Sequence, residues 1–387
     1  MNSRERVNVT LNHKEPDKVP IDLGGNQSSI HIIAYKKLLE YLEIEDDNIQ
    51  YADFVQQIVR PCDEILERFQ IDVRYIQPLG GMIRVQDMKP QVEQQYIGVY
   101  DQFGVFWGND IKKNITDILY YDPVIHPFAD FKSVSDVTNY DWPDGLDNSP
   151  FIGLKDYARK LREKADFALS TPPVGCVYEY CTFLFGFTKT LRFIKTKPEI
   201  IVSTMEELLK YWTDYATTFL TEVGDYLDIV CINGDVAEQA GPIMSLQLYE
   251  NMIKPIERKL SQKIHDTVDA KINYHSCGSI SQFIPHFAEI GYDIVNPVQL
   301  SAYNMEPCSL KKRFGSIMSF WGGLCNSQKT LPFGTPKQIR EEVKRNFNCL
   351  KPGGGFVASP IHNITAEVPP QNIVAMFDAA LEFRNYE

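Results

Sequence analysis

The stretch INYHSCG, residues 272–278, decides the fold prediction, because it is an apolar run that stops at a glycine. Side chains alternate between the two faces of a β-strand, so His275 and Cys277 project to one face and Ser276 to the other. An imidazole and a thiol side by side at a strand end can supply half of a tetrahedral zinc site. The stretch therefore predicts a strand that carries metal-binding side chains at its end.

Seven further runs are apolar, rich in β-branched residues and bounded by Gly, Pro, Asn or Asp: Val19–Leu23, Asp72–Ile76, Phe167–Thr171, Ile229–Gly234, Ile294–Val298, Ile317–Gly322 and Phe356–Ser359. Continuous hydrophobicity is typical of parallel strands that are covered on both faces. Helical patterns lie between the runs, at Pro198–Val223, Leu248–Thr267 (with a kink expected at Pro255), Ser279–Gly291 and Thr335–Leu350. Eight strands alternating with helices predict a (β/α)8 TIM barrel, with residues 1–387 as one domain.

An insertion is expected at about residues 80–148, after the second strand. Within Gly80–Asp110, the runs YIGVY (96–100) and FGVFW (103–107) flank Asp101-Gln102, which predicts an antiparallel hairpin. The range Tyr120–Asn148 is rich in Asp, Pro and aromatic residues, and we expect a surface loop with a short helix there.

Composition narrows the class of protein. The net charge of −12 and the pI of about 5.2 argue against nucleic-acid binding. The polar N-terminal stretch shows no secretory signal, and no apolar run approaches the roughly 20 residues that span a bilayer. We therefore expect a cytoplasmic enzyme with no membrane association. The eight cysteines lack framework spacing, so we expect buried thiols in a reducing compartment, with one or two as metal ligands.

The ends of four predicted strands carry the candidate site. Catalytic residues of such barrels come from the C-terminal ends of several strands. His275 and Cys277 end the fifth strand, Cys325 follows the seventh and His362 follows the eighth. These separations exclude a compact zinc finger and suit a pocket built from distant strands, in which a third ligand leaves a position open for catalysis. Cys325 or His362 could be that ligand, although Cys325 could equally pack in the core and His362 could contact substrate.

Carboxylates follow two other strands. The stretch NGDVAEQ, residues 233–239, places Asp235 and Glu238 after the fourth strand, where they could hold a substrate cation or act in acid–base catalysis. Asp235 could instead cap the next helix. Asp22, beside Gly24-Gly25 after the first strand, is a candidate substrate-binding residue by the same reasoning. The segment Cys176–Cys181, with Tyr178, is expected to form an aromatic loop at the barrel mouth.

Several stretches together resemble the uroporphyrinogen decarboxylase superfamily. They are NYHSCG (273–278), DIVNPVQ (293–299), FWGG (320–323), PGGGF (352–356), HNI (362–364) and VPPQN (368–372), with SRERV (3–7) and PDKVP (16–20) near the N-terminus. The resemblance covers nearly the whole chain. Members of this superfamily are (β/α)8 barrels, which agrees with the strand count.

The His-x-Cys signature resembles the branch of zinc-dependent methyltransferases that work with corrinoid proteins. This resemblance implies zinc as a cofactor, a corrinoid carried by a partner protein, and a small methyl donor or thiol-type acceptor as substrate. Gln299 and Trp321 lie in the matching stretches, and with Asp22 and Tyr178 they are expected to contact substrate. A homodimer is possible.

This chain departs from the family pattern at two places. The branch that uses coenzyme M typically has a cysteine as third ligand near the last strand, where this chain has His362, and Cys325 comes one strand earlier. Decarboxylases carry an arginine-rich N-terminal segment for substrate carboxylates, and Asp22-Leu23-Gly24-Gly25 stands about there instead. Decarboxylation of a carboxylated tetrapyrrole and non-catalytic corrinoid binding are the alternative functions.

Overall fold

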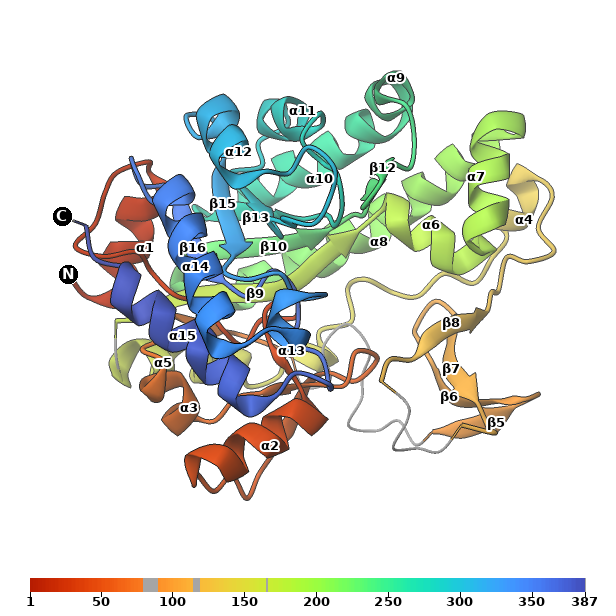
Figure 1. Ribbon diagram of the computed structural model, residues 1–387. Coiled ribbons are helices and arrows are strands. Elements are labelled where there is room, and N and C mark those ends of the chain that lie inside the picture. The colour runs from red at the N-terminus through yellow and green to blue at the C-terminus, as the bar shows by residue number, and fades with distance from the viewer. Residues whose placement is uncertain (79–89, 114–118, 165, 387) are drawn as a thin grey trace.

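A curled parallel sheet forms the centre of the molecule. The computed structural model describes residues 1–78, 90–113, 119–164 and 166–386 (Figure 1). Seven parallel strands lie in the order β16-β15-β14-β13-β10-β9-β4. Their bounds are β4 Val73–Tyr75, β9 Ala168–Cys176, β10 Ile229–Asn233, β13 Lys271–His275, β14 Ile294–Asn296, β15 Ser319–Gly323 and β16 Phe356–Ser359. The fold is α/β, and this sheet fits a TIM-like barrel.

The first predicted strand lies between the two edges of this sheet, although it is not a regular strand. The N–H of Asp22 donates to the carbonyl of Ala358, and the N–H of Ala358 donates to the carbonyl of Pro20, both at 2.9 Å. On the other edge, the N–H of Asp72 donates to the carbonyl of Ile21 at 2.8 Å. Pro20 has no N–H to donate, so this segment makes only an isolated bridge, between Ile21 and Ala358.

Strand β9 is longer than the sequence predicts. It continues through Pro172 and Pro173 to Cys176, where we expected a loop. Its register with β10 shifts twice between the pairs Ile229–Ser170 and Asn233–Cys176. Such bulges accommodate prolines, which cannot donate to the ladder. Helix α6, Tyr178–Phe185, follows almost at once. The predicted mouth loop is therefore wrong: the segment is a strand end and the start of a helix.

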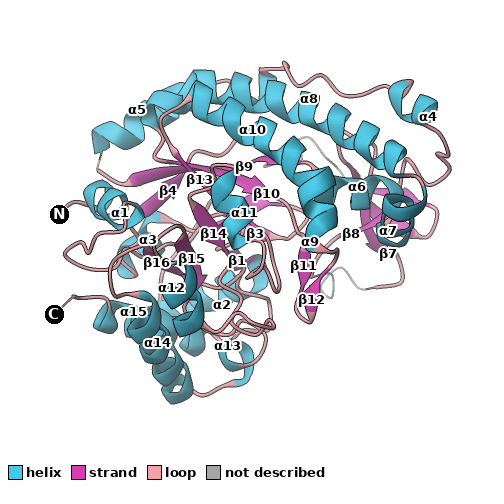
Figure 2. Ribbon diagram, turned by 90° about the horizontal axis from the view of Figure 1, so that it is seen from above, coloured by secondary structure: helices cyan, strands magenta, loops and turns pink. Residues whose placement is uncertain are grey.

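Helices cover the outside of the sheet (Figure 2). Thr335 is the N-cap of α14, because its side chain accepts the N–H of Gln338 and completes a capping box. At the predicted kink, a π-helical turn at Tyr249–Ile253 precedes Pro255, which lies in the first turn of the next helix. No helix in the described ranges is both long and apolar enough to cross a membrane. The helix bounds are α1 Ser3–Leu11, α2 Ile32–Leu42, α3 Asp63–Arg68, α5 Leu154–Lys164, α7 Phe187–Thr196, α8 Pro198–Val223, α9 Leu246–Leu248, α10 Lys254–Thr267, α11 Ile284–Glu289, α12 Pro307–Phe314, α13 Thr330–Phe333, α14 Pro336–Leu350 and α15 Pro370–Phe383.

A four-stranded antiparallel sheet lies between β4 and β9 in the sequence, to one side of the barrel in Figure 1. Its strands are β5 Gln91–Glu93, β6 Tyr96–Tyr100, β7 Phe106–Asp110 and β8 Asp122–Ile125. The short helix α4, Val134–Thr138, follows it. The hairpin was predicted within residues 80–110, of which residues 80–89 lie outside the described residues. Smaller elements are β1 Ile30–His31, β2 Gln50–Asp53, β3 Ile58–Arg60, β11 Ala237–Glu238 and β12 Gly241–Pro242.

Two cysteines form a disulfide bond. Cys308 in α12 is bonded to Cys349 in α14, and the bond joins two neighbouring helices of the outer layer. The expectation that all the cysteines would be reduced is therefore wrong for this pair. Their separation of 41 residues gave no signal in the sequence, because only the packing of α12 against α14 brings them together.

Candidate metal and substrate site

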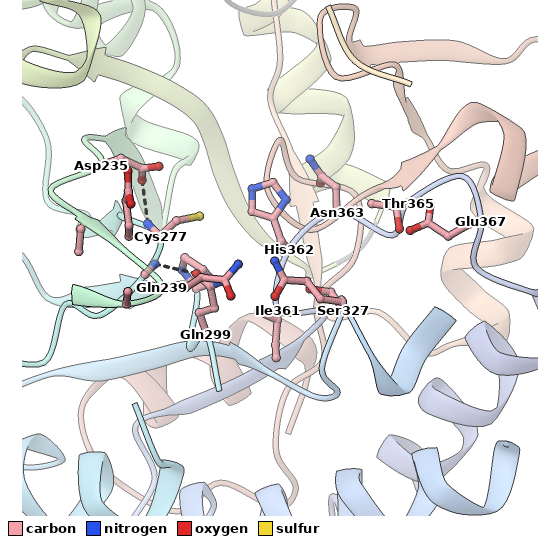
Figure 3. Close-up of a pocket in the computed structure, with 16 residues that line it drawn as sticks. Asp235, Gln239, Cys277, Gln299, Ser327, Ile361, His362, Asn363, Thr365 and Glu367 are labelled. Atoms are coloured by element: carbon pink, nitrogen blue, oxygen red, sulfur yellow. Dashed lines mark hydrogen bonds between the residues drawn. The ribbon is translucent and has the colours of Figure 1, made fainter. Parts of the chain in front are cut away.

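Three of the predicted metal ligands converge at the C-terminal ends of β13 and β16. Ligand atoms of His275, Cys277 and His362 all lie within 4.8 Å of one another. The Cys277 Sγ is 3.5 Å from the His275 Nε2, and the two imidazole centroids are 5.5 Å apart. Figure 3 shows the Cys277 sulfur and the His362 ring pointing toward each other. The described part of the chain thus brings together ligands that are far apart in sequence.

The spacing of these atoms fits a zinc ion. Tetrahedral zinc with ordinary Zn–S and Zn–N bonds places sulfur and nitrogen ligands about 3.5 Å apart. The observed distance between Cys277 Sγ and His275 Nε2 is 3.5 Å. Three protein ligands would leave a fourth position, as catalytic zinc sites do. Cys325 is buried and does not belong to this group of three ligands.

Asn296 orients the imidazole of His275. The His275 Nδ1 lies 2.6 Å from the Asn296 Oδ1, and the Asn296 Nδ2 donates to the Trp321 carbonyl at 3.0 Å. Because the amide nitrogen is used by that carbonyl, the amide oxygen faces His275, whose Nδ1 therefore donates. The Nε2 is left with its lone pair free toward Cys277. Asn296 was missed in the sequence, although it ends the neighbouring strand directly across from His275.

Burial sets the protonation of all three side chains. It lowers the pKa of His275 to about 4, and burial together with the nearby His275 lowers the pKa of His362 to about 4. Both imidazoles are therefore neutral near pH 7, as metal ligands must be. Burial, then the charges of Asp235 and Glu179, raise the pKa of the Cys277 thiol. A bound cation would reverse this effect, because it stabilises the thiolate.

Two cavities meet at this group of ligands. The outer cavity, of about 750 Å³, is drawn in Figure 3, and the inner cavity has a volume of about 200 Å³. Asp235, Cys277 and His362 line both. The candidate metal site therefore faces two separate spaces, each of which could hold a different reactant.

Asp235 and Glu179 form a partly buried carboxyl pair beside Cys277. The Asp235 Oδ1 accepts the N–H of Cys277 at 2.7 Å, so it holds the loop at Cys277 rather than capping a helix. The Glu179 Oε2 accepts the Asp235 N–H and the Cys176 thiol, both at 3.4 Å. Burial raises the pKa of both carboxyls, and the charge of Asp235 adds to the rise at Glu179. Glu179 was missed because the sequence placed the end of β9 too early.

The predicted substrate-binding residues divide into two groups. Gln299 and Glu238 line the outer cavity, and the Gln299 Oε1 accepts the N–H of Gly278 at 2.6 Å. Asp22, Tyr178 and Trp321 are almost fully buried and line neither cavity. The Trp321 indole N–H donates to the Asp22 Oδ2 at 2.9 Å, so these two residues contact each other inside the barrel. Their substrate contacts stay predictions.

Tyr274 anchors β13 from the face opposite to His275. Its hydroxyl donates to the Gly234 carbonyl at 2.7 Å and lies 2.9 Å from the Glu257 Oε1 on α10. The neighbouring His275 projects to the opposite face, toward Cys277 and His362. A Cβ on Gly234 would lie 2.4 Å from the Tyr274 hydroxyl, so this position requires glycine. The hydrogen bond from the Tyr274 hydroxyl to the Gly234 carbonyl joins the ends of β10 and β13.

Comparisons with known proteins agree on the family and the fold. A family model described as uroporphyrinogen decarboxylase (URO-D) matches residues 123–383. A curated protein named uroporphyrinogen decarboxylase, from Psychromonas ingrahamii, is 23% identical over 199 residues. That match covers 51% of this chain and 52% of the relative, so it spans about half of each. A solved structure described as a methyltransferase from Methanosarcina mazei has a TM-score of 0.66 at 17% identity, and the match covers 99% of both chains. At that identity the likeness concerns the fold alone.

Proposed function

This chain belongs to the uroporphyrinogen decarboxylase family, and on that premise we propose that it is a zinc-dependent methyltransferase. It would move a methyl group between a small methylated compound, or a thiol, and the corrinoid of a partner protein. The observation that carries the proposal is the convergence of His275, Cys277 and His362 where two cavities meet. This arrangement supplies three zinc ligands and leaves space beside them.

Each residue of the site would have a separate role. His275, Cys277 and His362 would hold zinc, which when bound supplies a Lewis acid for a heteroatom or keeps a thiol as its thiolate. Asn296 fixes the tautomer of His275, and Asp235 fixes the backbone of Cys277. The larger outer cavity is the space proposed for the partner's corrinoid, because a bulky group needs the wider approach.

The charge of the cavities supports methyl transfer over decarboxylation. Among the described residues that line the two cavities, none is lysine or arginine, whereas five are carboxylates: Asp53, Glu179, Asp235, Glu238 and Glu367. A tetrapyrrole rich in carboxylates would meet like charges there, which is unfavourable at short range. A small cation or neutral methyl donor meets no such repulsion.

Metal analysis of the purified protein tests the proposal. We expect about one zinc per chain in the wild type and little in the His275→Ala, Cys277→Ala and His362→Ala variants. Cys325→Ala is the control, since Cys325 lies outside the ligand group, and circular dichroism verifies that each variant is folded. Full zinc binding by the three variants, or loss of zinc in Cys325→Ala, would contradict the ligand assignment.

An activity assay separates the three candidate functions. Under reducing conditions with a corrinoid protein, we expect methyl transfer from a methylated donor and no conversion of uroporphyrinogen. Conversion of uroporphyrinogen without metal would overturn the proposal in favour of decarboxylation. Corrinoid binding with no transfer from methoxy-aromatic, methylamine or methanol donors would favour a non-catalytic binding protein.

A further inference from the structure

The inner cavity has an aromatic wall whose rings are held in place. Trp107, Tyr180 and Phe183 line it, and the Phe183 ring makes edge contacts with both others, with centroids 4.9 and 5.4 Å apart. The Trp107 indole N–H and the Tyr180 hydroxyl both donate to the Asp101 Oδ2, at 2.8 and 2.6 Å. The polar atoms of the two rings are thus occupied by Asp101. A ligand in the inner cavity can therefore contact only the apolar surfaces of these rings.

The same cavity contains carboxylates without a cationic partner. Asp53, Glu179 and Asp235 line it, and none forms an ion pair with a lysine or arginine within the described residues. Asp53 accepts the N–H of Gln56 at 2.9 Å and the Asn26 Nδ2 at 3.2 Å, both uncharged donors. A zinc ion held with one thiolate would add a single net positive charge, fewer than the negative charges that the three carboxyl groups can carry when ionised. A positively charged ligand would therefore be favoured in this space.

We propose that the methyl donor of this enzyme is a small methylated ammonium ion that binds in the inner cavity. This inference rests on the proposed methyltransferase function and names its substrate class. Aromatic faces combined with carboxylates are the usual protein surroundings of a quaternary ammonium group, whose charge is spread over methyl groups and cannot donate strong hydrogen bonds. The volume of about 200 Å³ restricts the ligand to a small ion.

The transfer balances without any further reactant than the partner's reduced corrinoid. The N–CH3 bond breaks and leaves its electron pair on nitrogen, so a quaternary ammonium ion departs as a neutral tertiary amine. A quaternary nitrogen has no lone pair for a metal ion, so a bound zinc would not coordinate this donor and would instead hold a thiol acceptor as its thiolate. The electron pair that forms the new bond to the methyl group comes from the reduced corrinoid. The donor loses its positive charge in this step, so the carboxylates bind the product less strongly than the substrate, which favours product release.

A pair of shape-matched ligands tests the site. Choline and 3,3-dimethyl-1-butanol have the same shape, but only choline is charged, and each is titrated into the zinc-loaded protein by calorimetry. We expect choline to bind at least about tenfold more tightly than the alcohol, and an anionic probe, 2-mercaptoethanesulfonate, to bind more weakly than choline. Equal affinity for choline and the alcohol, or no choline binding at millimolar concentration, would overturn the inference.

Variants assign the binding to the inner cavity. Glu179→Gln keeps the shape of the side chain but cannot ionise beside a bound cation, and Phe183→Leu removes one ring. We expect each to weaken choline binding about fivefold or more, whereas Glu206→Gln, an exposed position on α8 that lines neither cavity, changes nothing. Circular dichroism verifies folding. Unchanged choline affinity in both inner-cavity variants would place the cation elsewhere and refute the assignment.

The result also separates this inference from the proposed function. A protein that holds zinc and transfers methyl groups from methanol or methoxy-aromatic donors, but does not bind choline, keeps its function and loses the inference. A protein that binds choline through Glu179 and Phe183 but holds no zinc keeps the cation site and loses the proposed function.

Discussion

The two ends of the barrel differ in whether their carboxyl groups are paired with a positively charged side chain. At the N-terminal ends of the strands, Asp72 pairs with Arg6 at 2.5 Å, and Asp228 pairs with Arg4 at 2.8 Å, both arginines coming from α1. At the C-terminal ends, Glu179 and Asp235 are partly buried and have no such partner among the described residues. Paired charges hold α1 against the sheet, whereas carboxyl groups without a cationic partner are costly to ionise away from water, as we expect for side chains that would meet a ligand. The comparison separates a stabilising end from a functional end.

The largest expected effect comes from His275→Ala at the functional end. Bound zinc should fall from about one equivalent to less than about one tenth, and methyl transfer should disappear with it. The midpoint of thermal unfolding, compared with metal-free wild type, should change little, because the imidazole is not part of the apolar core. A large loss of stability in the metal-free state would show that this end also supports the fold.

The opposite pattern is expected for Asp228→Ala at the stabilising end. This carboxylate accepts from Arg4, from Arg162 and from the N–H of Leu169, so its removal leaves buried donors unpaired. We expect the free energy of unfolding in urea to fall by about 3–5 kcal/mol, with zinc content unchanged. Asp156→Asn, which breaks an exposed pair with Arg159, is the control and should cost less than about 1 kcal/mol. Loss of zinc in Asp228→Ala would remove the distinction between the two ends.

A smaller effect is expected for Asn296→Ala. The variant keeps all three proposed ligands but no longer orients His275, so zinc affinity should fall about 10–100-fold in chelator competition. Asn296→Asp keeps an oxygen acceptor for the His275 Nδ1 and should retain more of the affinity. Equal losses in the two variants would contradict an orienting role.

The smallest effect concerns the pH dependence of stability at Asp17. The hydrogen bonds from Arg6 lower the pKa of Asp17 to about 2, below the ordinary value of 3.8. A carboxylate with a lowered pKa contributes stability above its ordinary pKa, and that contribution is lost as the pH falls from 3.8 toward 2. Asp17 is partly exposed, so its contribution should stay below about 1 kcal/mol. Asp17→Asn should flatten acid unfolding slightly in this range; an unchanged curve would show that the ion pair contributes nothing.

The strands could be predicted from their apolar runs, but two ends could not. Glycines and prolines were interpreted as strand ends, which is right at Gly234, whereas β13 ends at His275, before Cys277 and Gly278. The same rule failed in β9, because bulges allow Pro172 and Pro173 to lie within a strand. The same rule predicted a regular strand at Val19–Leu23. The segment instead makes single backbone hydrogen bonds and an isolated bridge, because Pro20 has no N–H to donate.

The site could be predicted as far as strand order determines it. His275 was predicted as the end of a strand, which is correct, and His362 follows from the expected position of the last strand. Cys277 lies in the loop after β13 and not on the strand, although it still lies beside His275. The choice between His362 and Cys325 needed the backbone after β15, which places Cys325 in the core. Glu179 and the aromatic wall came from α6 and the antiparallel sheet, whose placement against the barrel no local pattern encodes.

The hydroxyl of Tyr274 has a consequence for engineering this scaffold. Since it joins the Gly234 carbonyl to a glutamate on α10, the distance between two neighbouring strand tips is controlled from the outer layer of the molecule. Replacing Tyr274 with phenylalanine would change no atom that faces the cavities, yet it would release the loop that presents Asp235. Redesign of the substrate space should therefore begin behind the barrel wall, where the lumen residues can be repositioned without being replaced.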